Sequence, residues 1–143
     1  MISDKTLSIV AFSSDFGKVH YALSIAAAAS ATNTSVTMMF TMGAIRALIT
    51  DDSDHPGWSK LPNDGKNKNG GAQDKMNQAR GVAGFEELLE ACISMDVTFL
   101  ICEMGLEAAD ISKEQLRKDI SYTPGGLVTF LNSASTNGQI LFI

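Results

Sequence analysis

The segment TFLICEMGL, residues 98–106, combines the two features on which the fold prediction depends. Its first four residues are apolar or β-branched, which is typical of a short buried strand. Cys102 follows at once, and the acidic Glu103 then begins a more polar segment. A buried strand that ends on a thiol has two interpretations. Cys102 is either a small core residue that closes the strand or a nucleophile at the edge of a sheet.

On both sides of this segment, short β-branched runs alternate with helical periods. Strands are predicted at Leu7–Phe12, Ser35–Phe40, Val97–Ile101 and Gln139–Ile143, with a possible fifth around Lys118–Tyr122. Helices are predicted around Val19–Ala26, Gly43–Ile49 and Phe85–Ile93, from Ser112 onward, and from Pro124 onward with Thr123 as the cap. Ser112 and Gln115 have the spacing of a capping box, and the chain is expected to turn directly after Cys102. This alternation predicts an α/β fold, in which a mainly parallel sheet of four or five strands has helices on both faces.

Residues 51–72 interrupt the pattern with the sequence DDSDHPGWSKLPNDGKNKNGGA. The segment is dense in turn-forming residues and too long for an ordinary connection. It is therefore expected to be a polar insertion, either a lid or a disordered loop, within one domain that spans residues 1–143. Helical periodicity resumes near Gln73.

Composition excludes several classes of protein. The chain has 143 residues, a formal charge of -5 and a sequence pI of about 4.8. A nucleic-acid-binding protein usually has a basic face, so none is expected as a partner. Two cysteines do not suggest a secreted disulfide scaffold, and no apolar run approaches the length that spans a membrane. We expect a cytoplasmic protein with free thiols and no membrane partner.

The two cysteines are predicted to differ in their surroundings. Cys102 lies at the carboxyl end of a predicted parallel strand, where reactive groups of such sheets gather. Helix-like amides after it would favour a thiolate, whereas the charge of Glu103 would oppose one. Cys92 lies on the apolar stripe of its helix and is predicted to be a core residue. Helix and strand rises place the two about 10 Å apart, too far for a disulfide, so a single-cysteine mechanism is favoured.

Other candidate residues have structural alternatives. The turn after the first strand contains Ser13, Ser14, Asp15 and Gly17, which could bind an anion, although capping by Ser14 or Asp15 is favoured. Gly125 and Gly126 open the last helix, where they would either approach a substrate or let the helix pack closely. Met38, Met39 and Met42 are expected to fill the core or, where they point to the rim of the sheet, to form an apolar mouth around Cys102. Trp58 would close a mouth around Cys102 or be buried at a subunit contact.

No metal or cofactor is expected. His20 and His55 are far apart in the sequence, and their spacing from other ligand-type residues does not predict a metal site.

Several segments together resemble the DsrE/DsrF-like family, in the branch often labelled "peroxiredoxin family protein". They are ICEMGLEAADISKEQL at 101–116, TPGGLVTFLNSAS at 123–135, the final LFI, and DFGKVHYALSIAAAASATNTSVTMMFTMGAIRAL at 15–48. The resemblance covers nearly the whole chain apart from residues 51–80. There, Lys75, Met76 and Asn77 match a segment common in relatives, but QARGVAG departs from it.

The resemblance implies a three-layer α/β/α fold and assembly into homo-oligomers. It also implies a sulfur carrier or sulfurtransferase that holds sulfane sulfur as a persulfide on Cys102 and exchanges it with thiols of donor or acceptor proteins. The predicted substrate-binding residues around this thiol are Ser13, Asp15, Gly17, Glu103, Met104, Gly125 and Gly126. Two alternatives remain open, a non-catalytic oligomeric binding or assembly protein and a single-cysteine redox protein, so enzyme activity is favoured but not decided.

Overall fold

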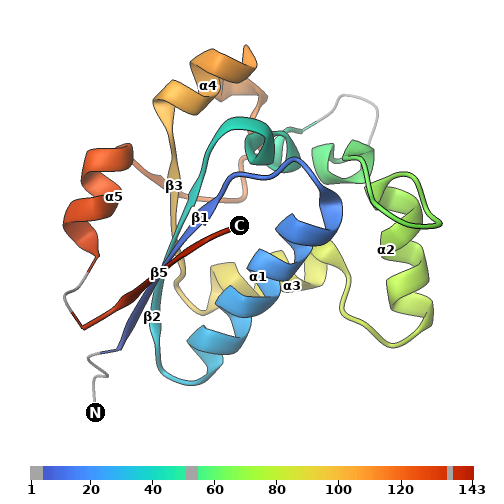
Figure 1. The fold of residues 1–143 in the computed structure, drawn as a ribbon, viewed down its shortest axis with the longest axis horizontal. Coiled ribbons are helices and arrows are strands. Elements are labelled where there is room, and N and C mark those ends of the chain that lie inside the picture. The colour runs from blue at the N-terminus through green and yellow to red at the C-terminus, as the bar shows by residue number, and fades with distance from the viewer. Residues whose placement is uncertain (1–4, 51–54, 135–136) are drawn as a thin grey trace.

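A computed structural model describes residues 5–50, 55–134 and 137–143, and it contains a five-stranded sheet in which all paired strands are parallel. The strand order is β4-β3-β2-β1-β5. The strands are β1 (Thr6–Ala11), β2 (Ser35–Phe40), β3 (Thr98–Ile101), β4 (Tyr122–Thr123) and β5 (Gln139–Phe142). The predicted α/β fold with a mainly parallel sheet is therefore confirmed (Figure 1). A fifth strand is present, but it is β4 at Tyr122–Thr123 and overlaps the predicted segment Lys118–Tyr122 only at Tyr122.

Helices cover both faces of the sheet. The α-helices are α1 (Phe16–Ala31), α2 (Gly70–Ala79), α3 (Phe85–Ser94), α4 (Glu103–Ala109) and α5 (Leu127–Ser133). The 3-10 helices are η1 (Met42–Leu48), η2 (Gly57–Lys60) and η3 (Lys113–Gln115). Helices α1 and α3 lie on one face, α5 lies on the other, and α4 extends from the end of β3 (Figure 1). This arrangement is the three-layer α/β/α fold.

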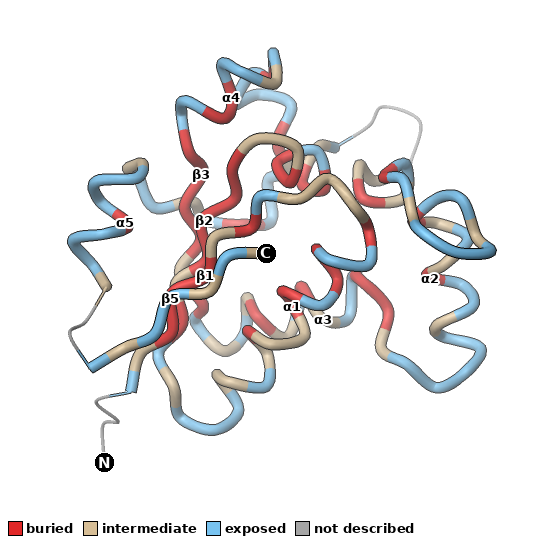
Figure 2. The backbone as a smooth tube through the Cα atoms, viewed as in Figure 1, coloured by how far each residue is buried: buried red, intermediate tan, exposed pale blue. Residues whose placement is uncertain are grey.

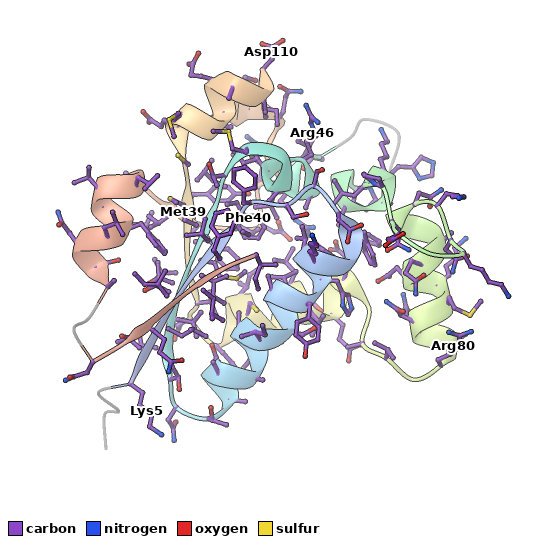
Figure 3. All side chains as sticks on the ribbon, in the orientation of Figure 1. Lys5, Met39, Phe40, Arg46, Arg80 and Asp110 are labelled. Atoms are coloured by element: carbon purple, nitrogen blue, oxygen red, sulfur yellow. The ribbon has the colours of Figure 1, made fainter. Side chains whose placement is uncertain are left out.

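Side chains alternate across the sheet and so divide the core into two parts. Met39 and Phe40 are neighbours in β2 but belong to different apolar clusters (Figure 3). Phe40 lies in the large cluster on the α1 and α3 side, where most of the buried chain is found (Figure 2). Met39 lies in a small cluster on the α5 side, whose other buried members are Leu100, Cys102 and Phe130.

The described part of the insertion is ordered and packed against the main core. The Trp58 ring lies 5.0 Å from the Phe85 ring and 6.0 Å from the Phe16 ring, measured between centroids. Gly70 approaches so closely that a beta carbon there would lie 2.6 Å from the Phe16 ring. Trp58 is therefore a core residue of this chain, and the prediction that it closes a mouth at Cys102 is wrong. Residues 51–54 lie outside the described residues.

Several element boundaries and types differ from those predicted. Thr123 pairs with Leu100 of β3, so it belongs to β4 and does not cap the last helix. The chain then turns through Gly125, whose φ of +139° is a conformation that favours glycine, and α5 begins only after Gly126. The helix predicted at Gly43–Ile49 is present, but as the 3-10 helix η1 and one residue earlier in the chain. The chain after Cys102, predicted as a turn, forms α4.

Candidate functional site

Cys102 lies directly after β3 and is the N-cap residue of α4. Its backbone N–H donates to the Phe40 carbonyl at 3.0 Å, and its carbonyl accepts from the Leu106 N–H at 3.0 Å. These bonds hold the residue at the edge where the parallel strands end, which we call the carboxyl edge. The residue is 2% exposed and packs in the small cluster under α5.

A hollow of about 370 Å³ lies between the beginning of α4 and the beginning of α5. Its lining residues are Cys102, Glu103, Met104, Gly125, Gly126, Leu127 and Val128. We call it the Cys102 hollow. Cys102 is therefore mostly covered by neighbouring side chains, but it also forms part of the wall of an open depression at the carboxyl edge.

The charge next to Cys102 is paired. Glu103 accepts a hydrogen bond from Lys113 Nζ at 2.9 Å, and both side chains are largely exposed. An exposed pair of this kind contributes little to stability, but it places a cation beside the carboxylate that was expected to oppose a thiolate. Lys113 was not among the predicted site residues. The capping box of Ser112 and Gln115, which the sequence did predict, orients the start of η3 where Lys113 lies.

The two glycines in the hollow have different structural roles. Gly125 is required by its positive φ, and a beta carbon there would also lie 2.5 Å from the Thr129 hydroxyl. Gly126 is the N-cap of α5, and a beta carbon there would meet no atom within 4 Å. Backbone sterics therefore explain Gly125 but not Gly126. The missing side chain of Gly126 leaves free space in the wall of the Cys102 hollow.

The remaining predicted site residues lie at the beginning of α1. Asp15 is the N-cap residue, and its carboxylate accepts from the Lys18 N–H at 3.1 Å. The Ser13 hydroxyl accepts from the Asp15 N–H at 3.0 Å, and Gly17 is exposed in the first turn. None of these three residues lines the Cys102 hollow. The predicted set is thus divided: four residues surround Cys102, and three form or flank the α1 cap, where capping by Asp15 is confirmed.

Cys92 lies on the opposite side of the sheet from Cys102. It is fully buried in the large cluster, and its Sγ lies 3.6 Å from the Leu23 carbonyl oxygen. Burial raises the pKa of the Cys92 thiol to about 11. Both cysteines are free. The sheet separates them, which agrees with the prediction that they form no pair.

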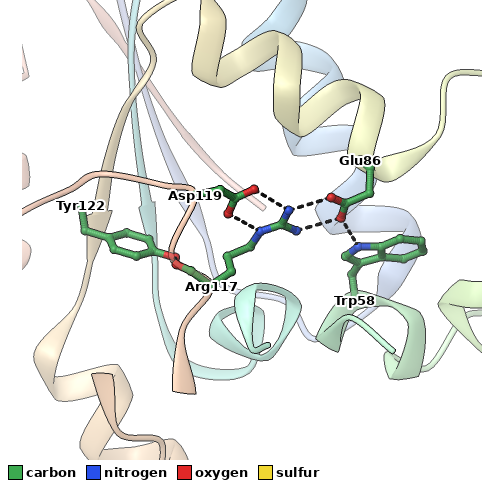
Figure 4. Close-up of polar contacts among 5 residues, drawn as sticks. All are labelled: Trp58, Glu86, Arg117, Asp119 and Tyr122. Atoms are coloured by element: carbon green, nitrogen blue, oxygen red, sulfur yellow. Dashed lines mark hydrogen bonds and ion pairs between the residues drawn. The ribbon is translucent and has the colours of Figure 1, made fainter. Parts of the chain in front are cut away.

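A polar cluster that the sequence did not predict joins the insertion to α3 and to the chain before β4 (Figure 4). Arg117 donates to Glu86 at 2.6 and 2.8 Å and to Asp119 at 2.7 Å. Trp58 Nε1 donates to Glu86 at 2.6 Å, and the Tyr122 hydroxyl donates to the Arg117 carbonyl at 3.2 Å. Hydrogen bonds from Arg117 lower the pKa of both carboxyl groups, whereas burial raises the pKa of Tyr122 to about 12. Each charged group has a partner of opposite charge, because Arg117 pairs with both carboxylates. We call this cluster of Trp58, Glu86, Arg117, Asp119 and Tyr122 the clamp.

Two further searches concern the described residues only. Among them, no group of three or more His, Cys, Asp or Glu side chains is arranged to hold a metal ion. No helix in the same part of the chain has the length and apolar character needed to cross a membrane.

Comparisons with known proteins identify the family. No curated protein matches the chain. A solved structure, the crystal structure of the YchN protein from E. coli, has a TM-score of 0.56 over 97% of this chain and 99% of that chain. At 17% identity this likeness shows the fold alone. A family model matches residues 57–142, which include most of the segment that the resemblance had set apart and leave out residues 15–48. The chain belongs to the DsrE/DsrF/DrsH-like family.

Proposed function

We propose that the protein is a sulfur carrier or sulfurtransferase in which Cys102 holds sulfane sulfur as a persulfide. The observation that carries this proposal is the position of Cys102 in the wall of an open hollow at the carboxyl edge of the sheet. Ligands of open α/β sheets bind at this edge. Cys92, the other thiol of the chain, is sealed in the large core and has a raised pKa. Family membership supports the same chemistry.

The proposed reaction is thiol exchange in two steps. In the first, the Cys102 thiolate attacks the outer sulfur of a donor persulfide. A new S–S bond to Cys102 forms, the S–S bond of the donor breaks, and the donor leaves as a thiolate that takes up a proton. In the second, an acceptor thiolate attacks the outer sulfur on Cys102, and the Cys102 thiolate is released. No net oxidation occurs, so the cycle needs no cofactor.

The surroundings of Cys102 suit an added sulfur atom. Gly126 contributes no side chain to the hollow, and the space beside it is open. Lys113 pairs with Glu103 and so offsets the negative charge nearest to the thiol. Leu127 and Val128 line the same hollow with apolar surface, which would limit the access of bulky reagents to the persulfide.

Mass spectrometry of the intact protein tests the proposal. The protein is incubated with a sulfane donor such as a polysulfide, freed of excess reagent, and weighed with and without a thiol reductant. We expect the wild type and Cys92→Ala to gain one sulfur atom, which the reductant removes, and Cys102→Ala to gain none. Equal loading of Cys102→Ala, or no loading of the wild type, would contradict the proposal.

A second candidate function, a binding or assembly protein of the same fold, is favoured by the exposed apolar residues on the α5 side. They are Met104, Leu127, Val128 and Leu131 from the two short helices, with Phe12, Ile140 and Phe142 at the edge of the sheet. Val10 pairs with Phe142, and Phe142 contacts Phe12, so the edge residues lie on the same face of the sheet as α5. We call this set the α5–β5 surface.

We propose that a second copy of this chain covers the α5–β5 surface. Neither α5 nor β5 contains a charged residue. Edge strands of monomeric proteins usually carry charges or other features that block pairing, and β5 is an edge strand. Val128 is 74% exposed and Phe142 is 69% exposed, which is unusual for large apolar side chains in a region without charge. A neighbouring copy would also enclose the Cys102 hollow, which α5 borders.

Analytical ultracentrifugation of two matched variants tests this assembly. Val128→Glu adds a charge to the α5–β5 surface, and Tyr21→Glu adds one to an exposed aromatic residue of α1 on the other face. We expect the wild type and Tyr21→Glu to sediment as an oligomer and Val128→Glu to sediment at a lower mass. A monomeric wild type, or an equal effect of both variants, would contradict the assembly without affecting the loading of Cys102.

A further inference from the structure

A second hollow, with a volume of about 780 Å³, lies apart from the Cys102 hollow. It forms where three segments meet: residues 46–50 after β2, residues 57–62 of the insertion, and residues 114–118 before β4. Ser14, which follows β1, also lines it. The hollow therefore lies beyond the ends of the central strands, at the carboxyl edge where ligands of open α/β sheets bind. We call it the Arg46 hollow.

The lining residues combine positive charge with apolar surface. Three of them are cationic, Arg46, Lys60 and Lys118, whereas Glu114 is the one acidic residue in the described lining. Apolar walls are supplied by Ile49, Leu61, Pro62 and Leu116. Among the described lining residues, cations therefore outnumber carboxylates by three to one, although the chain as a whole has a formal charge of -5.

Backbone hydrogen bonds hold the walls of the Arg46 hollow in place. The Thr50 N–H donates to the Gln115 carbonyl at 2.8 Å, and the Arg117 N–H donates to the Leu48 carbonyl at 2.9 Å. The Gly57 N–H donates to the Ile49 carbonyl at 2.8 Å. A beta carbon on Gly57 would lie 2.0 Å from the Arg46 carbonyl oxygen, so this contact requires glycine. The hollow is thus formed by bonded segments, as preformed binding sites are.

Arg46 is the cation most available to a ligand. Its side chain is exposed and extends outward from η1 (Figure 3), and it makes no hydrogen bond or ion pair with another described residue. The guanidinium of Arg117, by contrast, is paired with two carboxylates in the clamp (Figure 4). Within the described part of the chain, Lys118 donates to the Glu114 carbonyl alone, at a long 3.3 Å. The guanidinium of Arg46 is therefore free to donate to a bound anion.

We infer that the Arg46 hollow binds a small organic anion. Its carboxylate or phosphate group is held by Arg46 with the help of Lys118, and its carbon skeleton lies against Ile49, Leu61 and Leu116. A guanidinium donates two parallel hydrogen bonds to either type of anion. The volume falls in the range of about 300 to 1,000 Å³ that is usual for small-molecule sites. Cys102 does not line this hollow, so the inference stands independently of the proposed sulfur chemistry.

Titrations followed by ¹H–¹⁵N NMR test the inference with three probes that share one ring: phenyl phosphate, benzoate and the neutral benzyl alcohol. We expect one or both anions to shift the amide signals of Thr50, Gly57 and Gln115 in a saturable way, and the alcohol to bind much more weakly. The tighter of the two anions identifies the preferred group. Saturable binding of the alcohol with equal affinity would overturn the role of charge, and no shift with any probe would overturn the site.

Two charge variants distinguish anion binding in the Arg46 hollow from nonspecific attraction of the anion to surface cations. Arg46→Gln is expected to weaken binding about tenfold, which is typical for the loss of a charge-assisted hydrogen bond. Lys66→Gln removes an exposed cation of the insertion that does not line the hollow, so it should leave the affinity within about twofold. Equal weakening by both variants would overturn the assignment. The Arg46 side chain makes no hydrogen bond or ion pair with another described residue, and the substitution leaves its backbone carbonyl in place, so Arg46→Gln should unfold at the wild-type temperature.

Discussion

On one face of the sheet, α1 and α3 together contribute nine buried residues, whereas on the other face α5 contributes Phe130 alone. The two cysteines follow this division, with Cys92 deep in the first layer and Cys102 at the edge of the second. Parallel sheets are normally covered on both faces. The thin α5 layer therefore supplies little stability, and it is where this fold leaves apolar surface and a thiol within reach of other molecules.

The largest expected effect concerns packing on the two faces. Leu89→Ala removes a buried side chain of α3 and should lower the free energy of unfolding by about 3 kcal/mol. Phe130→Ala removes a larger buried side chain of α5 but should cost less, because the small cluster can be lost by local detachment of a two-turn helix. Urea denaturation of both variants measures the order. A greater loss for Phe130→Ala would mean that the thin layer is integral to the core.

The two thiols should also differ in reactivity. In Cys102→Ala, Cys92 is the remaining thiol, and with a pKa of about 11 roughly a thousandth of it is thiolate at pH 8. In Cys92→Ala, Cys102 is reached through its hollow. We expect iodoacetamide to label Cys102 faster than Cys92, by a factor on the order of a hundred. Similar rates in the folded state would show that the two faces do not differ in access.

The clamp, which joins α3 to the chain before β4, should contribute more to stability than the exposed pair of Lys113 and Glu103 beside Cys102. Arg117→Met removes the cation that pairs with Glu86 and Asp119 and leaves Glu86 with its hydrogen bond from Trp58. The change should cost about 1 to 2 kcal/mol at pH 7, since the carboxylates are partly exposed and screened. Lys113→Met breaks the exposed pair with Glu103 and should change stability by less than about 0.5 kcal/mol. Thermal unfolding of both variants gives the comparison. Equal losses of stability in the two variants would show that the clamp contributes no more than the exposed pair.

The cost of Arg117→Met should depend on pH in a defined direction. Arg117 lowers the folded-state pKa of Glu86 and Asp119. The stabilisation that these groups provide is therefore complete above their unfolded pKa of about 4, and it is lost as the pH falls through the lowered folded values. The difference between wild type and variant should be constant from pH 7 to 5 and should shrink below about pH 4. A difference that grows in acid would contradict the clamp.

The smallest expected effect on sulfur loading is that of the α1 cap, and it tests whether this cap belongs to the sulfur site. Asp15→Ala removes the N-cap of α1 and should cost about 1 kcal/mol. Because Asp15 does not line the Cys102 hollow, the variant should still load one sulfur atom at the wild-type rate. Loss of loading in a folded Asp15→Ala protein would return Asp15 to the substrate-binding set.

Much of the fold could be predicted because the relevant signals are local. Helix α3 followed from an apolar period within three turns, the Asp15 cap from a side chain next to the amides it accepts from, and the Ser112–Gln115 capping box from a spacing of three residues. The burial of Cys92 was predicted from the same apolar stripe of α3. The strands followed from runs of β-branched residues, and their parallel pairing followed from the helices between them.

Features made by distant segments could not be predicted in this way. The strand order, the extension of β4 to Thr123 and the delayed start of α5 depend on pairing with β3. The packing of Trp58 against Phe16 and Phe85 could not be predicted from its position in a polar loop. Arg117 and Glu86 are 31 residues apart. Periodicity and capping act over one or two turns, whereas these contacts form only after the chain has returned across the sheet.

The same division applies to the candidate site. Cys102, at the end of a short buried strand, could be singled out from the residues around it, because the apolar run before it and the change to polar residues after it lie within a few neighbouring positions. Whether its thiol faces a hollow, which glycine leaves room beside it, and which cation joins Glu103 depend on where α4, α5 and η3 meet. The Arg46 hollow likewise exists only where three separate segments are bonded together.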